Sequence, residues 1–216
     1  ACTSHPMVKP SSGKGALWGY VELVRRSGVK PPAKNDPVYA NSKFKNVELV
    51  DYSQPGFAVA YVDGLPSPEG TTKLVIRDAG GGKPEFATPN GVVGVGGRIV
   101  LRNEDSLGHV ISCSELEFFG RLEPGEEVEI DAGLAGEAKF FVLDRSDDKA
   151  LVFVAPGPWC AASEDGRWLL NDLPPGDATI QVWHPRLPSA AQTVTVRADE
   201  ALRVDLSVGV DNLETN

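Results

Sequence analysis

The chain has 216 residues, of which 41% are hydrophobic and 24% are charged. This composition is that of a folded globular protein and excludes an intrinsically disordered one. The net charge is −9 and the basic residues are scattered along the sequence, without the basic patch that is typical of nucleic-acid-binding proteins. No apolar run approaches the roughly 18 residues needed to cross a bilayer. The length fits one large or two small domains.

The first residues predict an exported protein held beside a membrane. Ala1 precedes Cys2, and a small residue before cysteine resembles the end of a bacterial lipoprotein signal, whose cysteine becomes the lipidated first residue. Residues 5–15 are rich in proline, serine, glycine and lysine, so they predict a flexible tether. The alternative is a frayed terminus left by processing. We favour lipidation at Cys2 and a location in the bacterial periplasm or cell envelope.

Short runs of alternating or β-branched residues, each bounded by glycine, proline, asparagine or aspartate, predict strands along the whole chain. Up to residue 155 these strands are expected at 17–24, 47–50, 57–62, 74–76, 92–95, 98–102, 109–112, 126–130, 138–143 and 151–155. A polar stretch at 27–42 predicts a long loop. No segment has the pattern of an amphipathic helix.

Residues 155–158, Ala-Pro-Gly-Pro, predict a boundary between two modules. Five more strands are predicted beyond this boundary, at 159–162, 167–170, 178–183, 192–196 and 202–208. We therefore expect an all-β chain with a tether at 1–15, one β-sandwich at 16–155 and a second at 156–216. A sandwich of about 60 residues is marginally stable alone, so the second is expected to lean on the first.

Three motifs of the second module resemble those of a known family. They lie at residues 165–168 (Asp-Gly-Arg-Trp), 173–177 (Leu-Pro-Pro-Gly-Asp) and 182–185 (Val-Trp-His-Pro). Asp-Gly is typical of a hairpin turn and Pro-Pro-Gly of a stiff turn. Together the motifs resemble the carboxypeptidase-regulatory-like domain, which implies a transthyretin-like β-sandwich without catalytic activity.

The first module resembles the first half of a cupredoxin. Residues 99–105 (Ile-Val-Leu-Arg-Asn-Glu-Asp) are followed by His109 and then by residues 122–126 (Leu-Glu-Pro-Gly-Glu). In cupredoxins an Asn-x-Asp loop precedes the first copper-ligating histidine. The order of the two modules is similar to that of exported proteins called methylamine-utilisation-like, and the resemblance covers about residues 45–210.

The second half of the cupredoxin ligand set is missing from the sequence. A blue-copper site uses two imidazoles, a thiolate and a weak axial thioether, supplied in part by a Cys-x-x-His-x-x-Met loop. Aligned without gaps, those positions fall on Val142, Arg145 and Asp148. Valine has no donor atom and arginine is a permanent cation that repels a metal. The sequence therefore predicts a cupredoxin-like fold that has lost its copper, so we expect no cofactor, with copper as the minor alternative.

His109 and Cys113 are the candidate metal ligands that remain. They are four residues apart in a predicted strand, so their side chains point to the same side. Two ligands make a poor metal site without others, and a buried structural histidine and a buried cysteine are the favoured interpretation. Cys2, Cys113 and Cys160 are an odd number of cysteines, so at least one lies outside any disulfide. A Cys113–Cys160 bridge remains open.

We expect a binding or scaffold protein and not an enzyme, because the sequence contains no Gly-x-Ser-x-Gly elbow, phosphate-binding loop or zincin helix. The resemblance implies docking on a membrane-bound complex of the electron-transfer type. Five aromatic residues are candidate interface anchors, namely Trp18, Tyr20, Phe118, Phe119 and Trp159. The alternatives are a copper-binding or electron-transfer protein with a non-standard site at His109 and Cys113, and a carbohydrate-binding module.

Overall fold

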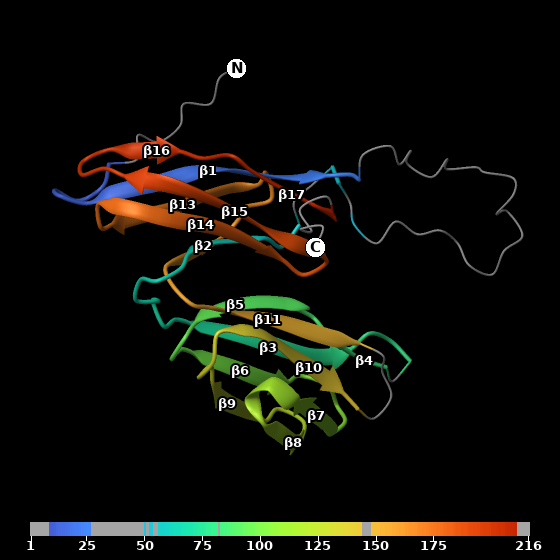
Figure 1. Ribbon diagram of the computed structural model, residues 1–216. Coiled ribbons are helices and arrows are strands. Elements are labelled where there is room, and N and C mark those ends of the chain that lie inside the picture. Colours follow the sequence, from blue (N-terminus) through green and yellow to red (C-terminus); the bar gives the residue numbers. More distant parts are fainter. Residues whose placement is uncertain are drawn as a thin grey trace, which may run out of the picture.

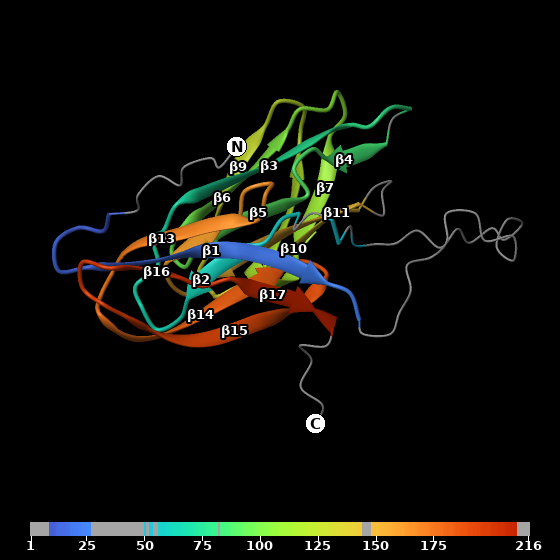
Figure 2. The ribbon, with the colours of Figure 1, turned by 90° about the horizontal axis from the view of Figure 1, so that it is seen from above.

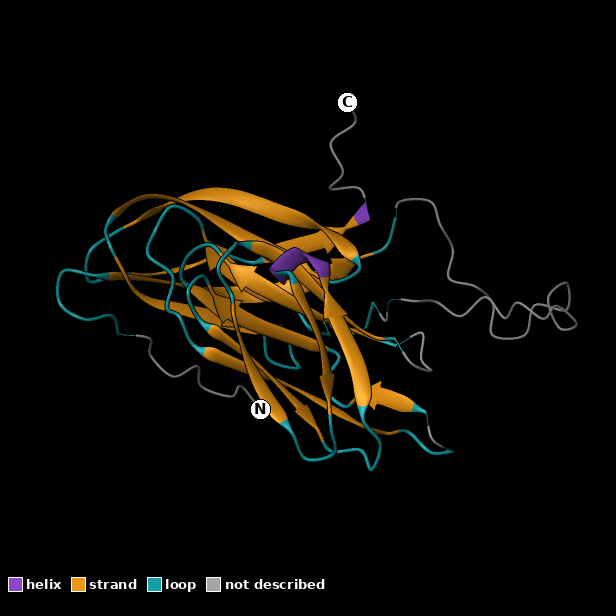
Figure 3. Cartoon of the chain, turned by 90° about the horizontal axis from the view of Figure 1, so that it is seen from below, coloured by secondary structure: helices purple, strands orange, loops and turns teal. Residues whose placement is uncertain are grey.

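The computed structural model describes residues 9–26, 50, 52–53, 56–81, 83–143 and 148–210. Apart from the short 3-10 helix η1 (Ser114–Leu116), the elements of this part of the chain are β-strands (Figure 3). No helix among the described residues is long and apolar enough to span a membrane. The strands form four sheets that pack in pairs around separate cores. The prediction of an all-β chain built from two β-sandwich modules is confirmed.

One sandwich, which we call the terminal module, combines strands from both ends of the chain (Figure 1). Its first sheet has the order β13 (Arg167–Leu173), β1 (Gly15–Val24) and β16 (Ala201–Arg203), and β17 (Leu206–Gly209) also pairs with β1. Its second sheet has the order β12 (Trp159–Ala161), β2 (Val59–Val62), β14 (Gly176–His184) and β15 (Leu187–Val196). Leu17, Trp168 and Ile180 are fully buried between the two sheets.

The other sandwich, which we call the inserted module, lies between β2 and β12 in the chain. One sheet has the order β5 (Asn90–Gly94), β11 (Lys149–Ala155), β10 (Gly136–Val142), β7 (His109–Cys113) and β8 (Phe118–Leu122). The other has the order β4 (Pro84–Phe86), β3 (Thr71–Asp78), β6 (Arg98–Asn103) and β9 (Glu127–Asp131). Its core holds Leu74, Ile99, Ile111 and Phe140, all shielded from solvent.

The module boundary expected at residue 155 differs from the observed strand pairing. β1 pairs with β13, and β2 pairs with β14, so strands expected in the first module lie in sheets with the second. The physical reason is burial, because strands β12 through β17 of the C-terminal segment cannot cover their own apolar faces without β1 and β2. The inserted module is therefore confined to β3 through β11, within a terminal module that is completed from both ends of the chain.

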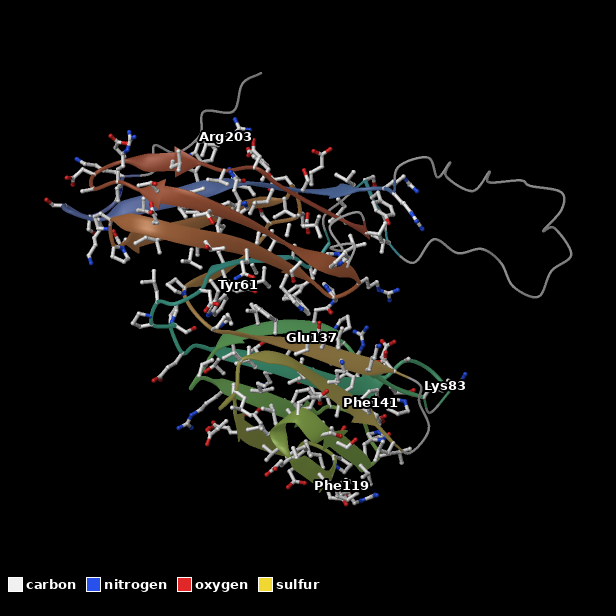
Figure 4. The ribbon with its side chains drawn as sticks, in the orientation of Figure 1. Tyr61, Lys83, Phe119, Glu137, Phe141 and Arg203 are labelled. Atoms are coloured by element: carbon white, nitrogen blue, oxygen red, sulfur yellow. The ribbon has the colours of Figure 1, made fainter. Side chains whose placement is uncertain are left out.

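The two modules meet through an aromatic cluster, which we call the junction. Val59, Tyr61 and Trp183 of the terminal module pack against Val92, Leu151, Phe153 and Ala155 of the inserted module. The rings of Phe153 and Trp183 stack with centroids 4.9 Å apart, and Trp183 Nε1 donates to Glu137 Oε1 at 2.9 Å. In Figure 4, Tyr61 and Glu137 face the junction from opposite modules. A stacked aromatic pair contributes about 0.5–1.5 kcal/mol beyond the burial of its area, so this contact helps to hold the modules together.

The two connecting segments that cross the junction are hydrogen-bonded to one another. Ser67 Oγ donates to the carbonyl oxygens of Ala155 and Gly157, both at 3.0 Å. Trp159 Nε1 donates to Pro68 O at 3.2 Å. A Cβ on Gly157 would lie 1.8 Å from Val62 O, so glycine permits the close approach of the two segments. The junction is thus fixed by side-chain hydrogen bonds to backbone carbonyl oxygens as well as by packing.

Candidate functional site

His109 begins β7 and is buried, with 2% of its surface exposed. Its Nε2 lies 2.9 Å from Oδ2 of Asp105, whose side chain is also buried. The other oxygen of Asp105 accepts hydrogen bonds from the backbone amides of Ser106 and Leu107. Burial raises the pKa of the Asp105 carboxyl, but the hydrogen bonds from His109 and these amides outweigh it and hold the pKa below its usual value.

Asn103 fixes the loop that carries Asp105. Its Nδ2 donates to the carbonyl oxygens of Leu107 at 2.8 Å and Leu122 at 3.0 Å, and its Oδ1 accepts from the amide of Asp105 at 2.9 Å. A fully buried amide must have such partners, because an unsatisfied one would cost about 1–3 kcal/mol. The Asn-x-Asp motif therefore acts here as a hydrogen-bonded brace behind His109.

The positions of the second cupredoxin ligand loop do not fit a copper ion. Val142 is a buried core side chain without a donor atom, and Asp148 Oδ2 accepts a hydrogen bond from the amide of Phe86 at 2.6 Å. Arg145 lies outside the described residues. Within the described ranges, no three His, Cys, Asp or Glu side chains converge as a metal site would require. The residues placed here lack the thiolate and second imidazole of a blue-copper centre.

Cys113 lies at the opposite end of β7 from His109. Both side chains point into the inserted module, as their spacing predicts, but four residues of strand separate them by about 13 Å. One ion cannot bind both, so the two-residue site considered from the sequence is not assembled. Burial raises the pKa of the Cys113 thiol. Cys113 and Cys160 are both free and lie in different cores, whereas Cys2 lies outside the described residues.

An exposed apolar patch lies on the outer face of the five-stranded sheet, over strands β10, β7 and β8. We define it as Val110, Phe119, Phe141 and Leu143. Phe119 on β8 and Phe141 on β10 both stand opposite Ser112 of β7, and they are 74% and 39% exposed. Leu143, 53% exposed, donates its amide to Val110 O. Side chains that are exposed in the same cross-strand row share a face. Figure 4 labels both phenylalanines on the inserted module, away from the junction.

The five aromatic residues proposed as anchors have different positions. Phe119 is the exposed one, whereas its neighbour Phe118 points inward and packs against the core of the inserted module. Trp159 packs at the junction. Trp18 and Tyr20 are half-buried on the outer face of β1, where the Arg203 guanidinium lies 5.4 Å and 5.5 Å from their ring centroids.

Phe141 and Leu143 belong to the patch but are absent from the sequence-based set of anchors. The run 138–143 is almost wholly apolar, which is typical of a central strand buried on both faces. The structure buries Ala138 and Phe140 on one face, whereas Phe141 is exposed on the other because the terminal module does not reach that far. The alternation of Glu137, Lys139 and Phe141 on one face was the available signal.

Comparison with known proteins finds similarity to solved structures alone. No protein-family description matches the chain, and no curated protein matches it. A purple cupredoxin from Nitrosopumilus maritimus is 20% identical over 39% of this chain and 99% of its own, with a TM-score of 0.34. A Cu(I) mutant of amicyanin is 15% identical over 44% of this chain and 97% of its own, with a TM-score of 0.32.

An oxidised mutant of amicyanin gives a similar result, at 17% identity over 44% of this chain and 97% of its own, with a TM-score of 0.33. These proteins are cupredoxins, the kind of fold that the sequence resemblance implied for one module. Every one of these TM-scores is below 0.5, so the similarity carries no argument about the fold. The two sandwiches are instead defined by the strand pairing observed in this structure.

Proposed function

We propose that this protein is a non-catalytic binding or scaffold protein that docks on a protein partner through the patch of Val110, Phe119, Phe141 and Leu143. The observation that carries the proposal is Phe119, an aromatic side chain that is 74% exposed on a strand of a rigid sheet. Burying a phenylalanine contributes about 1.5–3 kcal/mol, which is the scale of an interface hot spot. A strand position also holds the ring in place before binding, which lowers the entropic cost of association.

The surroundings of the patch support a protein partner. Arg121 and Glu123 form an ion pair at 2.7 Å beside Phe119, and Lys139 and Glu137 form another at 3.5 Å on the same face as Phe141. An apolar centre bordered by charged side chains is typical of a protein interface. The patch lies on strands of the same five-stranded sheet whose strands β5 and β11 pack at the junction, so the sheet supports it.

The partner class is part of this proposal and follows from the sequence resemblance. We propose a membrane-bound complex of the electron-transfer type, reached in the cell envelope through lipidation of Cys2. The second ligand loop favours the scaffold role over copper binding, because Val142 has no donor atom and the Asp148 carboxylate accepts the amide of Phe86. We also propose that the protein is not an enzyme, since Asp105 and His109 are almost wholly shielded from solvent and so from any substrate.

The test is affinity purification of the tagged full-length protein from gently solubilised membranes of its host. The wild type is compared with the double variant Phe119→Asp/Phe141→Asp, and with Leu134→Asp as the matched control. Leu134 is 72% exposed on the same module but outside the patch. We expect a stoichiometric set of membrane proteins with the wild type and with Leu134→Asp, reduced at least tenfold in the double variant.

Two outcomes would contradict the proposal. If the double variant retains the same partners, the patch is not the docking surface. If the wild type is monomeric and unassociated and carries stoichiometric copper in the same preparation, the electron-transfer alternative replaces the scaffold role. Circular dichroism of each variant shows whether the sheet remains folded, so that lost binding is not confused with unfolding.

A further inference from the structure

The sequence contains two Asp-Gly pairs and one Asn-Gly pair, the combinations in which aspartate or asparagine rearranges most readily. They lie at residues 63–64, 165–166 and 90–91. In this rearrangement the amide nitrogen of the following residue attacks the side-chain carbonyl carbon and closes a five-membered imide. Glycine favours the step, because no Cβ hinders its nitrogen or restricts its φ. The folded backbone then decides which pair can react, since the nitrogen must reach that carbon.

Asp63 and Gly64 form an exposed turn in the segment between β2 and β3. The amide nitrogen of Gly64 donates to Oδ1 of Asp63 at 2.7 Å. Because Cγ is one bond beyond Oδ1, the nitrogen lies close to the carbon that it would attack, near the separation of about 3–3.5 Å from which such reactions proceed. Gly64 has a φ of +80°, and nothing lies within 4 Å of a Cβ built on it, so the turn has room to close the ring.

The second Asp-Gly pair is held in an unreactive arrangement. The amide of Gly166 donates to the carbonyl oxygen of Ser163 at 2.8 Å, so its proton is engaged within the turn. The Asp165 carboxylate accepts hydrogen bonds from Ser163 Oγ at 2.6 Å and from the Arg167 amide at 3.4 Å. The bond from Ser163 contributes most to lowering the pKa of Asp165, which favours the ionised form. An ionised carboxylate resists attack, because it cannot release its oxygen as water.

Burial protects two further positions. The Asn-Gly pair at 90–91 opens β5, where it pairs with β11 and Gly91 is buried, so its rearrangement would require the strands to separate. Asp105 makes the same contact as Asp63 with the amide that follows it. Its carboxylate, however, is buried and lies 2.9 Å from His109, which holds it ionised. Among these positions, Asp63 alone combines an exposed carboxyl group with a facing glycine amide.

We propose that Asp63 is a modification site, at which the folded protein converts aspartate to isoaspartate through a cyclic imide. The Gly64 nitrogen bonds to Cγ of the neutral Asp63 carboxyl, the C–OH bond breaks, and the hydroxyl leaves as water with the amide proton. Water then adds to the main-chain carbonyl carbon of the imide and breaks its bond to nitrogen, so that the chain runs through Cβ and Cγ. The reaction needs no oxidant, reductant or second substrate besides water.

The turn lies in one of the two segments that cross the junction. It follows Val62, whose amide donates to Pro158 O at 3.0 Å, and it precedes Ser67, which donates to Ala155 O. Figure 1 shows the segment between β2 and β3 as a loop that passes from one module to the other, and Figure 2 shows the same loop from above. Isoaspartate adds one methylene carbon to the main chain between these two hydrogen-bonded residues, so the conversion lengthens the segment without breaking it.

The experiment incubates the full-length protein in warm, mildly acidic buffer, either folded or in urea, and maps isoaspartate by mass spectrometry with electron-transfer fragmentation. Acid is used because the neutral carboxyl is the form that loses water. The variant Asp63→Glu keeps a carboxyl group but would have to close a six-membered ring. The variant Asp63→Asn reaches the same imide by losing ammonia in neutral buffer. Its matched control is Asp165→Asn, in the other Asp-Gly pair.

We expect the folded wild type to form at least tenfold more isoaspartate at residue 63 than at residue 165, and both residues to react at similar rates in urea. Folded Asp63→Asn should deamidate at least tenfold faster than folded Asp165→Asn, and Asp63→Glu should form no product at residue 63. Equal conversion at residues 63 and 165 in the folded protein, or conversion of residue 63 in urea alone, would overturn the proposal. The reaction requires no partner, so these outcomes are independent of the patch on the inserted module.

Discussion

At the scale of single residues, the Asn-x-Asp loop shows how a motif can keep its geometry and change its use. Asn103 and Asp105 satisfy one another and the backbone around them, and the carboxylate then meets His109 at 2.9 Å. The sequence identified all three positions through the cupredoxin resemblance. It could not show that the imidazole faces Asp105, because that contact depends on the direction of two buried side chains.

The Asp105 carboxyl makes acid stability a test of this arrangement. Its pKa in the folded state is lower than the value of about 3.9 expected in the unfolded chain. The resulting stabilisation is present above that value and is lost as the pH falls through the folded pKa. We expect the free energy of unfolding of the wild type to fall more steeply below about pH 4 than that of Asp105→Asn. Urea unfolding at a series of pH values measures both slopes.

Glu164→Gln is the matched control for this experiment, because Glu164 is an exposed carboxylate in a turn. It should keep the wild-type slope. Identical slopes for the wild type and Asp105→Asn would show that the Asp105–His109 contact contributes nothing to acid stability.

At the scale of elements, β1 is the strand that joins two short partners into one sheet. It pairs in parallel with β16 through Trp18 and with β17 from Val21 onward. Between the two, the amide of Tyr20 donates to Asp205 Oδ1 at 3.1 Å, and the amide of Val204 donates to Trp18 O. The sequence predicted one continuous strand at 202–208. The break between β16 and β17, which the Asp205 side chain bridges, leaves the alternation of apolar residues intact, so the sequence pattern does not reveal it.

Gly19 makes this exchange of partners sterically feasible. A Cβ at this position would lie 1.8 Å from the carbonyl oxygen of Val204, which is part of the backbone and cannot rotate away. We expect Gly19→Ala to lower the free energy of unfolding by about 1–3 kcal/mol, the usual cost of overpacking. Chemical denaturation of the purified variant measures it. Gly133→Ala is the control, since nothing lies within 4 Å of its added carbon, and a wild-type stability for Gly19→Ala would disprove the close approach.

At the scale of the whole molecule, the junction couples the two sandwiches. Phe153 and Trp183 stack at 4.9 Å with an interplanar angle of 11°, and Tyr61 packs against Phe153 at 5.1 Å. Burial and then the charge of Asp63 raise the pKa of the Tyr61 hydroxyl, which donates to Gln181 at 2.9 Å. Since the inserted module is tethered at both ends, these contacts decide whether the modules unfold together or separately.

Removing Trp183 should separate the unfolding of the two modules. We expect one cooperative calorimetric transition for the wild type and two for Trp183→Leu, because the variant loses the ring stack and the hydrogen bond to Glu137. The free energy of unfolding should fall by less than the about 3–5 kcal/mol known for Trp→Ala changes, because leucine keeps part of the apolar contact. Trp18→Leu, on the outer face of β1, should keep a single transition. A single transition for Trp183→Leu would show that the connecting segments alone couple the modules.

The sequence by itself determined the fold class, the places of most strands and the loss of the second copper-ligand loop. These properties are local, since a period of two and the turn residues report strand and burial within one segment. Tertiary structure alone decided the insertion of one sandwich into the other, because β1 and β2 find their partners beyond residue 155. It also decided that Phe119 is exposed and Phe118 packs inward. Adjacent strand residues face opposite ways, and only the packed partner selects which one is covered.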